Sequence, residues 1–134
     1  MPKDNIQNQP KVLVIEDDQR INKVYTVKLS VEGIKVATAI DGEEGLRKVY
    51  SELPDLIILD LMLPKKSGFE ILKEIKADSR VKHIPVLILS NLAQEKEIDE
   101  GMALGADGYI VKSNVSIQQV VEKIQETIEK TKKK

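Results

Sequence analysis

The run from Leu56 to Asp60, four aliphatic residues followed by a carboxylate, constrains the fold more than any other feature of the sequence. Pro54 precedes this run and Pro64 follows it. A continuous apolar run of this length is typical of a strand buried on both faces, which occurs almost only in parallel sheets covered by helices. Because ligands of such sheets bind beyond the carboxyl ends of the strands, Asp60 is a candidate site residue. The ordinary alternative is an aspartate that caps the next turn.

Short aliphatic runs and helical patterns alternate along the rest of the chain. The other four runs cover Lys11–Glu16, Ile34–Ala39, Val86–Leu89 and Tyr109–Val111. Between them and after the last, apolar residues recur at helical spacing, as in Ile21, Val24, Tyr25 and Leu29. Five strand–helix units in strict alternation predict an α/β fold: a five-stranded parallel sheet with helices on both faces and right-handed crossovers.

Length and composition set the outer limits. We expect one domain over residues 11–130, after a flexible lead-in over 1–10 and before a basic tail over 131–134. There is no cysteine, which excludes disulfides and thiolate metal sites. No segment has the length of a signal peptide or a membrane span, so we expect a soluble, cytoplasmic protein without a membrane partner. The charges balance at 21 basic and 22 acidic residues, which argues against a nucleic-acid partner.

Polar and charged residues follow four of the predicted strands. Glu16 and Asp17 end the first strand and Asp60 the third, while Ser90 and Lys112 end the fourth and fifth. These ends lie on one edge of a parallel sheet, and the three acids meet if the first and third strands are neighbours. Three carboxylates with no nearby cysteine or histidine suit a hard cation, Mg²⁺ best, with Mn²⁺ as an alternative.

This set of groups suits acceptance of a phosphoryl group. Asp60 would attack phosphorus and form an acyl phosphate. A metal on Asp17 and Asp60 would offset charge on the transferring oxygens, and Ser90 and Lys112 would each bind one oxygen. Each residue taken alone also has a structural explanation, as a cap, a turn residue or a surface charge.

Four motifs now identify a family resemblance: VLVIEDD, LIILDLMLPKKSG, VLILS and GADGYIVK. Over residues 11–130 the chain resembles the receiver domains of two-component response regulators. The resemblance, and not the residues themselves, implies the strand order 2-1-3-4-5. It further implies roles for individual residues. Asp60 is the phosphoacceptor, Asp17 the direct metal ligand, Glu16 a ligand through water and Met62 a backbone-carbonyl ligand. Ser90 and Lys112 bind the phosphoryl group, and the two switch residues are Ser90, through its hydroxyl, and Tyr109, whose ring turns inward on activation.

The resemblance also implies a function. We expect a single-domain response regulator that depends on Mg²⁺ for phosphorylation and then changes a partner-binding face, without being a turnover enzyme. The implied partners are a histidine kinase or phosphotransfer protein as donor and a downstream protein, with no nucleic acid. The implied assembly is a monomer or a weak dimer that forms on phosphorylation.

The sequence departs from the family pattern at three places. Ser113 follows Lys112 where the family has proline, often in a cis bond; before serine a cis bond would cost about 3 kcal/mol, so we expect a trans peptide. Asn91 stands where the family has a small residue and would narrow access to the phosphoryl group. Met62 and Leu92 are apolar where fast self-hydrolysing receivers tend to be polar. We therefore predict a long-lived phosphoaspartate.

Three alternatives compete with this interpretation. A pseudo-receiver would use the same fold as a phosphorylation-independent binding module, which Ser113 and Asn91 keep open. A phosphatase of the haloacid dehalogenase type is disfavoured, because it needs a second acid where Met62 stands. A flavodoxin-like flavin site is disfavoured too, because the three acids would repel the flavin phosphate. His83, the only histidine, is interpreted as a solvated loop residue.

Overall fold

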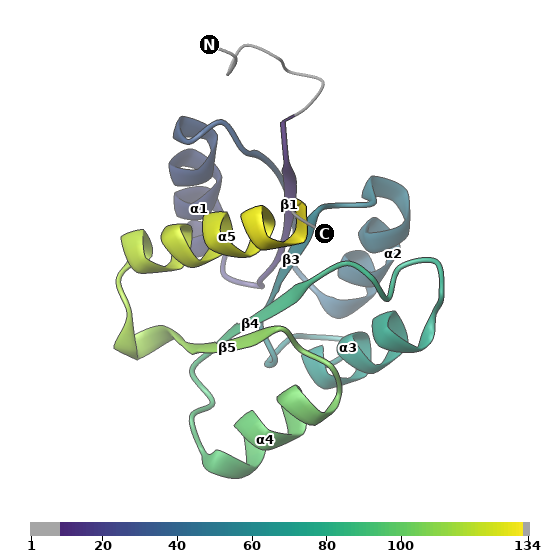
Figure 1. Ribbon diagram of the computed structural model, residues 1–134. Helices are drawn as coiled ribbons and strands as arrows, with labels where there is room; N and C mark the ends of the chain where they lie inside the picture. Colours follow the sequence, from purple (N-terminus) through teal and green to yellow (C-terminus); the bar gives the residue numbers. More distant parts are fainter. Residues whose placement is uncertain (1–8, 133–134) are drawn as a thin grey trace.

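The computed structural model describes residues 9–132, in which five strands and five α-helices alternate along the chain (Figure 1). All strands are parallel, in the order β2-β1-β3-β4-β5, so the predicted fold class and strand order are confirmed. The strands are β1 (Lys11–Ile15), β2 (Lys35–Ala39), β3 (Leu56–Leu59), β4 (Val86–Ser90) and β5 (Gly108–Val111). The helices are α1 (Gln19–Val31), α2 (Gly42–Glu52), α3 (Gly68–Ala77), α4 (Glu95–Ala103) and α5 (Ile117–Lys132), with a short 3₁₀ helix, η3 (Lys112–Asn114), before the last.

Alternate side chains along the strands build two separate cores. On one face, Leu13 and Ile15 of β1 pack with α2 and α3. On the other face, Val12 and Val14 pack with residues of α1 and α5. All four residues of β3 are buried, which confirms that this strand is covered on both sides. The helices therefore form two layers, α1 and α5 against α2, α3 and α4, with the sheet between them (Figure 1).

Helix ends follow the signals in the sequence. Asp41 caps α2 by accepting a hydrogen bond from the Glu44 N–H at 2.8 Å. Ser116 and Gln119 form a reciprocal capping pair before α5. Gly33 ends α1 with φ +83°, a left-handed conformation that glycine adopts without a steric penalty.

The ends of the chain differ from the expectation in one respect. Helix α5 runs to Lys132, so it extends into the segment predicted as a basic tail. Most of the predicted lead-in, residues 1–8, lies outside the described residues, as do 133–134. Between residues 9 and 132, no helix is both long enough and apolar enough to cross a membrane.

Candidate functional site

Three acids from neighbouring strand ends converge at the carboxyl edge of the sheet. Glu16 and Asp17 follow β1, Asp60 follows β3, and these two strands are paired residue by residue. One carboxylate oxygen from each acid lies within 4.8 Å of the others. Glu16 and Asp60 are buried, at 3% and 6% exposure, and Asp17 faces solvent. An all-oxygen set of this kind, open to solvent on one side, fits a hard divalent cation held by all three residues.

Lys112 binds two of these acids from the other end of the site. Its Nζ lies 2.6 Å from Glu16 Oε1 and 3.1 Å from Asp60 Oδ2. Burial lowers the pKa of Lys112, but the hydrogen bond to Glu16 and the charge of Asp60 outweigh it and raise that pKa above its ordinary value. Burial raises the pKa of Glu16 despite the opposing hydrogen bond from Lys112. The lysine thus stays charged and offsets part of the repulsion among the acids.

The loop after Asp60 is fixed by its backbone. The Met62 N–H donates to Asp60 Oδ1 at 3.2 Å, and the Gly68 N–H donates to the Leu61 carbonyl at 3.0 Å. A Cβ on Gly68 would lie 2.4 Å from the Asp60 carbonyl oxygen, so only glycine lets α3 begin this close to the loop. The Met62 side chain is 61% exposed, and the metal-binding role of its carbonyl stays a prediction.

Ser90 and Tyr109 both hold the loop between β4 and α4, at the same residue. Ser90 is fully buried, and its Oγ accepts a hydrogen bond from the Leu92 N–H at 3.2 Å. The Tyr109 hydroxyl donates to the Leu92 carbonyl at 2.6 Å. The sequence pointed to Leu92 only as an apolar neighbour of the site, whereas the structure makes it the link between the two predicted switch residues.

The structure places three further residues that the sequence analysis discussed: Ser113, Asn91 and His83. No peptide bond within residues 9–132 is cis, so Ser113 follows Lys112 through a trans bond, as predicted, and η3 begins there. Asn91 and His83 are exposed. The interpretation of His83 as a solvated loop residue therefore holds.

Two residues of the site escaped the sequence analysis. Asn22 of α1 is buried, and its Nδ2 donates to the Glu16 carbonyl at 2.7 Å. The Asp18 N–H donates to Glu16 Oε2 at 3.0 Å, so the backbone and side chain of Glu16 are both held from α1. The signal that could have found Asn22 is a polar residue three positions before Tyr25 on the apolar face of the helix.

Comparisons with known proteins fit this geometry. The family model described as "Response regulator receiver domain" matches residues 12–125. The chain belongs to the response regulator receiver domain family. The solved structure of a CheY-like receiver domain protein from Methanospirillum hungatei JF-1 is 27% identical to this receiver domain, with a TM-score of 0.87 over 94% of this chain and 98% of that one.

A second solved structure bears on the metal. It is the Mn²⁺-bound form of the response regulator Rcp1, 27% identical to this receiver domain, with a TM-score of 0.75 over 87% of this chain and 90% of that one. The receiver domain described here presents the cluster of Glu16, Asp17 and Asp60 that can hold such an ion.

The relatives correct the expected set of partners. RpaA from Synechocystis, named a DNA-binding dual master transcriptional regulator, is 34% identical over 122 residues, which are 91% of this chain and 50% of RpaA. Other curated relatives are named as transcriptional regulators too, and the chain spans about half or less of their length. The expected partner set, which excluded nucleic acid, is therefore wrong. The reason is that charge balance was read from a receiver domain alone, and it does not report on the rest of a longer regulator.

Proposed function

We propose that this receiver domain accepts a phosphoryl group on Asp60 in a reaction that depends on Mg²⁺ or Mn²⁺, and that the product changes the face formed by α4, β5 and α5. The observation that supports this most directly is Lys112, whose ammonium contacts Asp60 and Glu16 at the same time. A buried carboxylate with a cation beside it is poised to act as a nucleophile toward a dianionic phosphoryl group, because the positive charge offsets the repulsion.

In the proposed reaction, an Asp60 carboxylate oxygen forms a bond to the phosphorus of an acyl phosphate. The bond between phosphorus and the bridging oxygen breaks, and the carboxylate of the donor leaves with the electron pair. Lys112 then has a phosphoryl oxygen as an additional acceptor, and Ser90 can donate its hydroxyl proton to another. A divalent ion on Glu16, Asp17 and Asp60 would supply positive charge near the transferring oxygens. Asp60 is consumed once per transfer, so we do not propose a turnover enzyme.

Phosphorylation of Asp60 would affect the surface through Leu92, which contacts both Ser90 and Tyr109. If Ser90 turns its hydroxyl toward a phosphoryl oxygen, the Leu92 N–H loses or shares its acceptor. The same residue's carbonyl holds the Tyr109 hydroxyl, so the loop and the ring move together. Phosphorylation then shifts the population of loop conformations rather than creating a new one.

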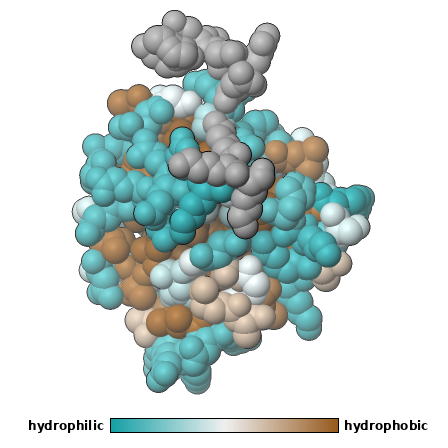
Figure 2. Space-filling view, in the orientation of Figure 1, coloured by the Kyte–Doolittle hydropathy of each residue, from teal (hydrophilic) through white to brown (hydrophobic). Residues whose placement is uncertain are grey.

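The face that would change is partly apolar. Figure 2 shows hydrophilic residues over most of the visible surface, with hydrophobic ones gathered below α5 on the side of β5 and α4. Met102 of α4 and Ile117 of α5 are 44% and 37% exposed.

The cytoplasmic location expected from the sequence stays a prediction.

The test is labelling with acetyl phosphate and Mg²⁺, read by intact-protein mass spectrometry. We expect the wild type to gain about 80 Da, the mass of one phosphoryl group on an aspartate nucleophile. Asp60→Asn should gain nothing. Asp55→Asn is the matched control, because Asp55 is an exposed carboxylate just before the same strand, at its opposite end, and should label like the wild type.

Two outcomes would overturn the proposal. If the wild type stays unlabelled by any small phosphodonor, and beryllofluoride with Mg²⁺ leaves its spectra unchanged, the chain is a pseudo-receiver. If Asp60→Asn labels like the wild type, the acceptor is another residue.

A further inference from the structure

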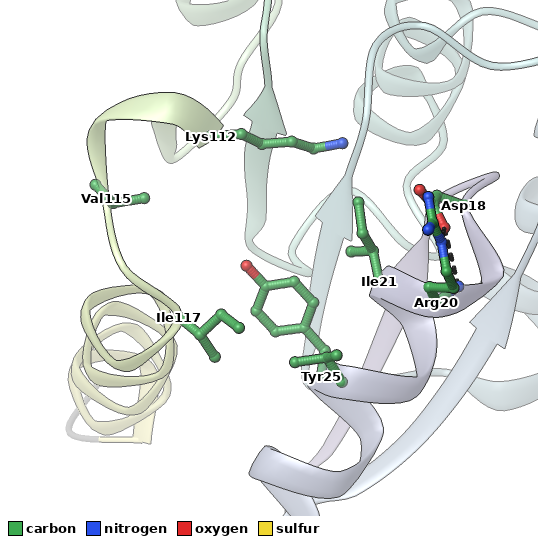
Figure 3. Close-up of a pocket in the computed structure, with 8 residues that line it drawn as sticks. Asp18, Arg20, Ile21, Tyr25, Lys112, Val115 and Ile117 are labelled. Atoms are coloured by element: carbon green, nitrogen blue, oxygen red, sulfur yellow. Dashed lines mark hydrogen bonds and ion pairs between the residues drawn. The ribbon is translucent and has the colours of Figure 1, made fainter.

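A cavity of about 490 Å³ lies beside the site, between the first half of α1 and the segment from Lys112 to Ile117 (Figure 3). Its walls are mainly aliphatic, formed by Ile21 and Val24 on one side and by Val115 and Ile117 on the other. Lys112 and Tyr25 belong to the same lining. Lys112, whose ammonium contacts Asp60, therefore belongs both to the site and to the lining of the cavity.

Tyr25 presents its hydroxyl to this cavity. Only 8% of the residue is exposed, but among the described residues only Asn22 Oδ1 is a buried side-chain atom without a hydrogen-bond partner, so the Tyr25 hydroxyl is reached by solvent through the cavity. Figure 3 shows the ring rising from α1 with its hydroxyl directed toward the segment that carries Lys112. A phenol hydroxyl in this position can take water in the cavity as its hydrogen-bond partner.

The charges of the site reach this hydroxyl. Burial raises the pKa of Tyr25, the charge of Lys112 lowers it, and the charge of Glu16 raises it again. Lys112 and Glu16 are therefore close enough for their charges to act on the Tyr25 hydroxyl.

Lys112 has a donor to spare. An ammonium carries three N–H donors. Glu16 and Asp60 accept two of them, and no other residue in the described part of the chain accepts the third. The cavity has room and polar groups for water, which needs two to four such partners to be held.

We propose that Tyr25 is a positioning residue for Lys112: through water in this cavity, its hydroxyl accepts the third N–H of the lysine and keeps the ammonium between Glu16 and Asp60. This inference rests on the proposed phosphorylation of Asp60. Its consequence is that Tyr25 sets the rate of acceptance without touching the phosphoryl group.

The test compares Tyr25→Phe, which removes only the hydroxyl, with the wild type in acetyl-phosphate labelling at saturating Mg²⁺. We expect the initial rate of Asp60 labelling to fall about three- to tenfold, the range of one lost hydrogen bond. The beryllofluoride dissociation constant should rise by a similar factor. Tyr50→Phe is the matched control, since its hydroxyl contacts Asp78 and lies outside the site; it should label at the wild-type rate.

A double-mutant cycle with Lys112→Gln separates positioning from packing. In the Lys112→Gln background, the Tyr25→Phe change should have no further effect on labelling. Tyr25→Leu, which also removes the ring, is expected to slow labelling no more than Tyr25→Phe in protein that remains folded by circular dichroism.

Three results would overturn the inference. Equal rates for Tyr25→Phe and the wild type would show that the hydroxyl has no role. The same loss with and without Lys112 would show that it does not act through the lysine. A loss confined to Tyr25→Leu would assign the effect to ring packing. An unlabelled wild type is distinguishable from all three, because it removes the proposed function and this inference together.

Discussion

The ammonium of Lys112 and the carboxylate of Glu16 lie 2.6 Å apart, although 96 residues separate them in the sequence. Glu16 follows β1 and Lys112 follows β5, and two strands stand between these in the sheet. The lysine therefore reaches across the carboxyl edge of the sheet, past Asp60. Its hydrogen bond to Glu16 lowers the pKa of that acid and so opposes burial, which raises it.

Removal of this lysine should destabilise the fold. Lys112→Met leaves Glu16 and Asp60 without their shared cation, and breaking a buried pair costs about 3 kcal/mol in the free energy of unfolding. Mg²⁺ should restore part of the loss, because the ion supplies positive charge to the same carboxylates. Urea unfolding with and without Mg²⁺ measures both effects. Lys123→Met is the control, since Lys123 pairs, among the described residues, only with Glu126 on the surface; a loss as large in this variant would contradict the assignment.

The carboxyl-edge residues were predictable because periodicity and strand ends are local signals. The apolar run before Asp60 and the acids after β1 each indicate a position on the sheet edge, and the family resemblance then gives the order that brings them together. The hydrogen bond from Asn22 to the Glu16 carbonyl was not predictable, because it depends on the rotation of α1 against β1. Leu92 was missed as a link for a different reason: it bonds the Ser90 and Tyr109 side chains through its own backbone N–H and carbonyl, which any residue provides.

Gly68 should tolerate no side chain. In Gly68→Ala the new Cβ would lie 2.4 Å from the Asp60 carbonyl oxygen and 2.6 Å from Leu61 Cα, both backbone atoms that cannot turn away. We expect a loss of about 3 kcal/mol in unfolding free energy, as in severe overpacking, together with slower Asp60 labelling. Gly33→Ala meets no atom within 4 Å and should lose only about 1 kcal/mol, from its left-handed backbone, with labelling unchanged. Similar losses for the two variants would refute the steric argument.

A second cluster of charged and polar side chains, away from the site, contributes to the way the stability of the fold depends on pH. Asp78 Oδ2 accepts hydrogen bonds from the Tyr50 hydroxyl at 2.6 Å and from Arg80 Nη2 at 2.7 Å, which joins the end of α3 to α2. The hydrogen bonds from Arg80, and next the one from Tyr50, hold the pKa of Asp78 well below its ordinary 3.8.

The sign of the pH dependence follows from that lowered pKa. Stability from the ionised Asp78 is fully present above the unfolded pKa of 3.8 and is lost progressively as the pH falls below it. Asp78→Asn should therefore be less stable than the wild type at neutral pH, with a gap that narrows as the pH drops below 3.8. Urea midpoints at neutral pH and at about pH 3 test this. A gap that stays constant over this range would exclude the linkage.

Met62 should slow the loss of the phosphoryl group. Its side chain is 61% exposed, two residues after Asp60, and it offers no hydrogen bond to an attacking water. Met62→Asn adds an amide that can orient that water, so we expect phosphate release to become about tenfold faster, less than the roughly hundredfold or more that a positioned general acid or base contributes. Release of inorganic phosphate from the labelled protein gives the rate. Met102→Asn, the same apolar-to-polar change at an exposed position of α4, is the control and should release phosphate at the wild-type rate. A wild-type half-life of seconds would contradict the prediction of a long-lived product.

Asp17→Asn should show two things: how much the repulsion among the three acids destabilises the fold, and whether these acids hold the metal ion. Its carboxylate lies within 4.8 Å of those of Glu16 and Asp60, so Asp17→Asn removes one of three like charges. Without metal we expect this variant to be more stable than the wild type by about 1 kcal/mol, since the repulsion acts near solvent and is partly screened. With Mg²⁺ or Mn²⁺ at a hundred times its dissociation constant the wild type should gain about 2.7 kcal/mol, and the variant little. Asp99→Asn, at an exposed position of α4, is the control for the change in net charge. If Asp17→Asn gained as much from the metal as the wild type, the ion would bind elsewhere and the cluster would have no role in holding it.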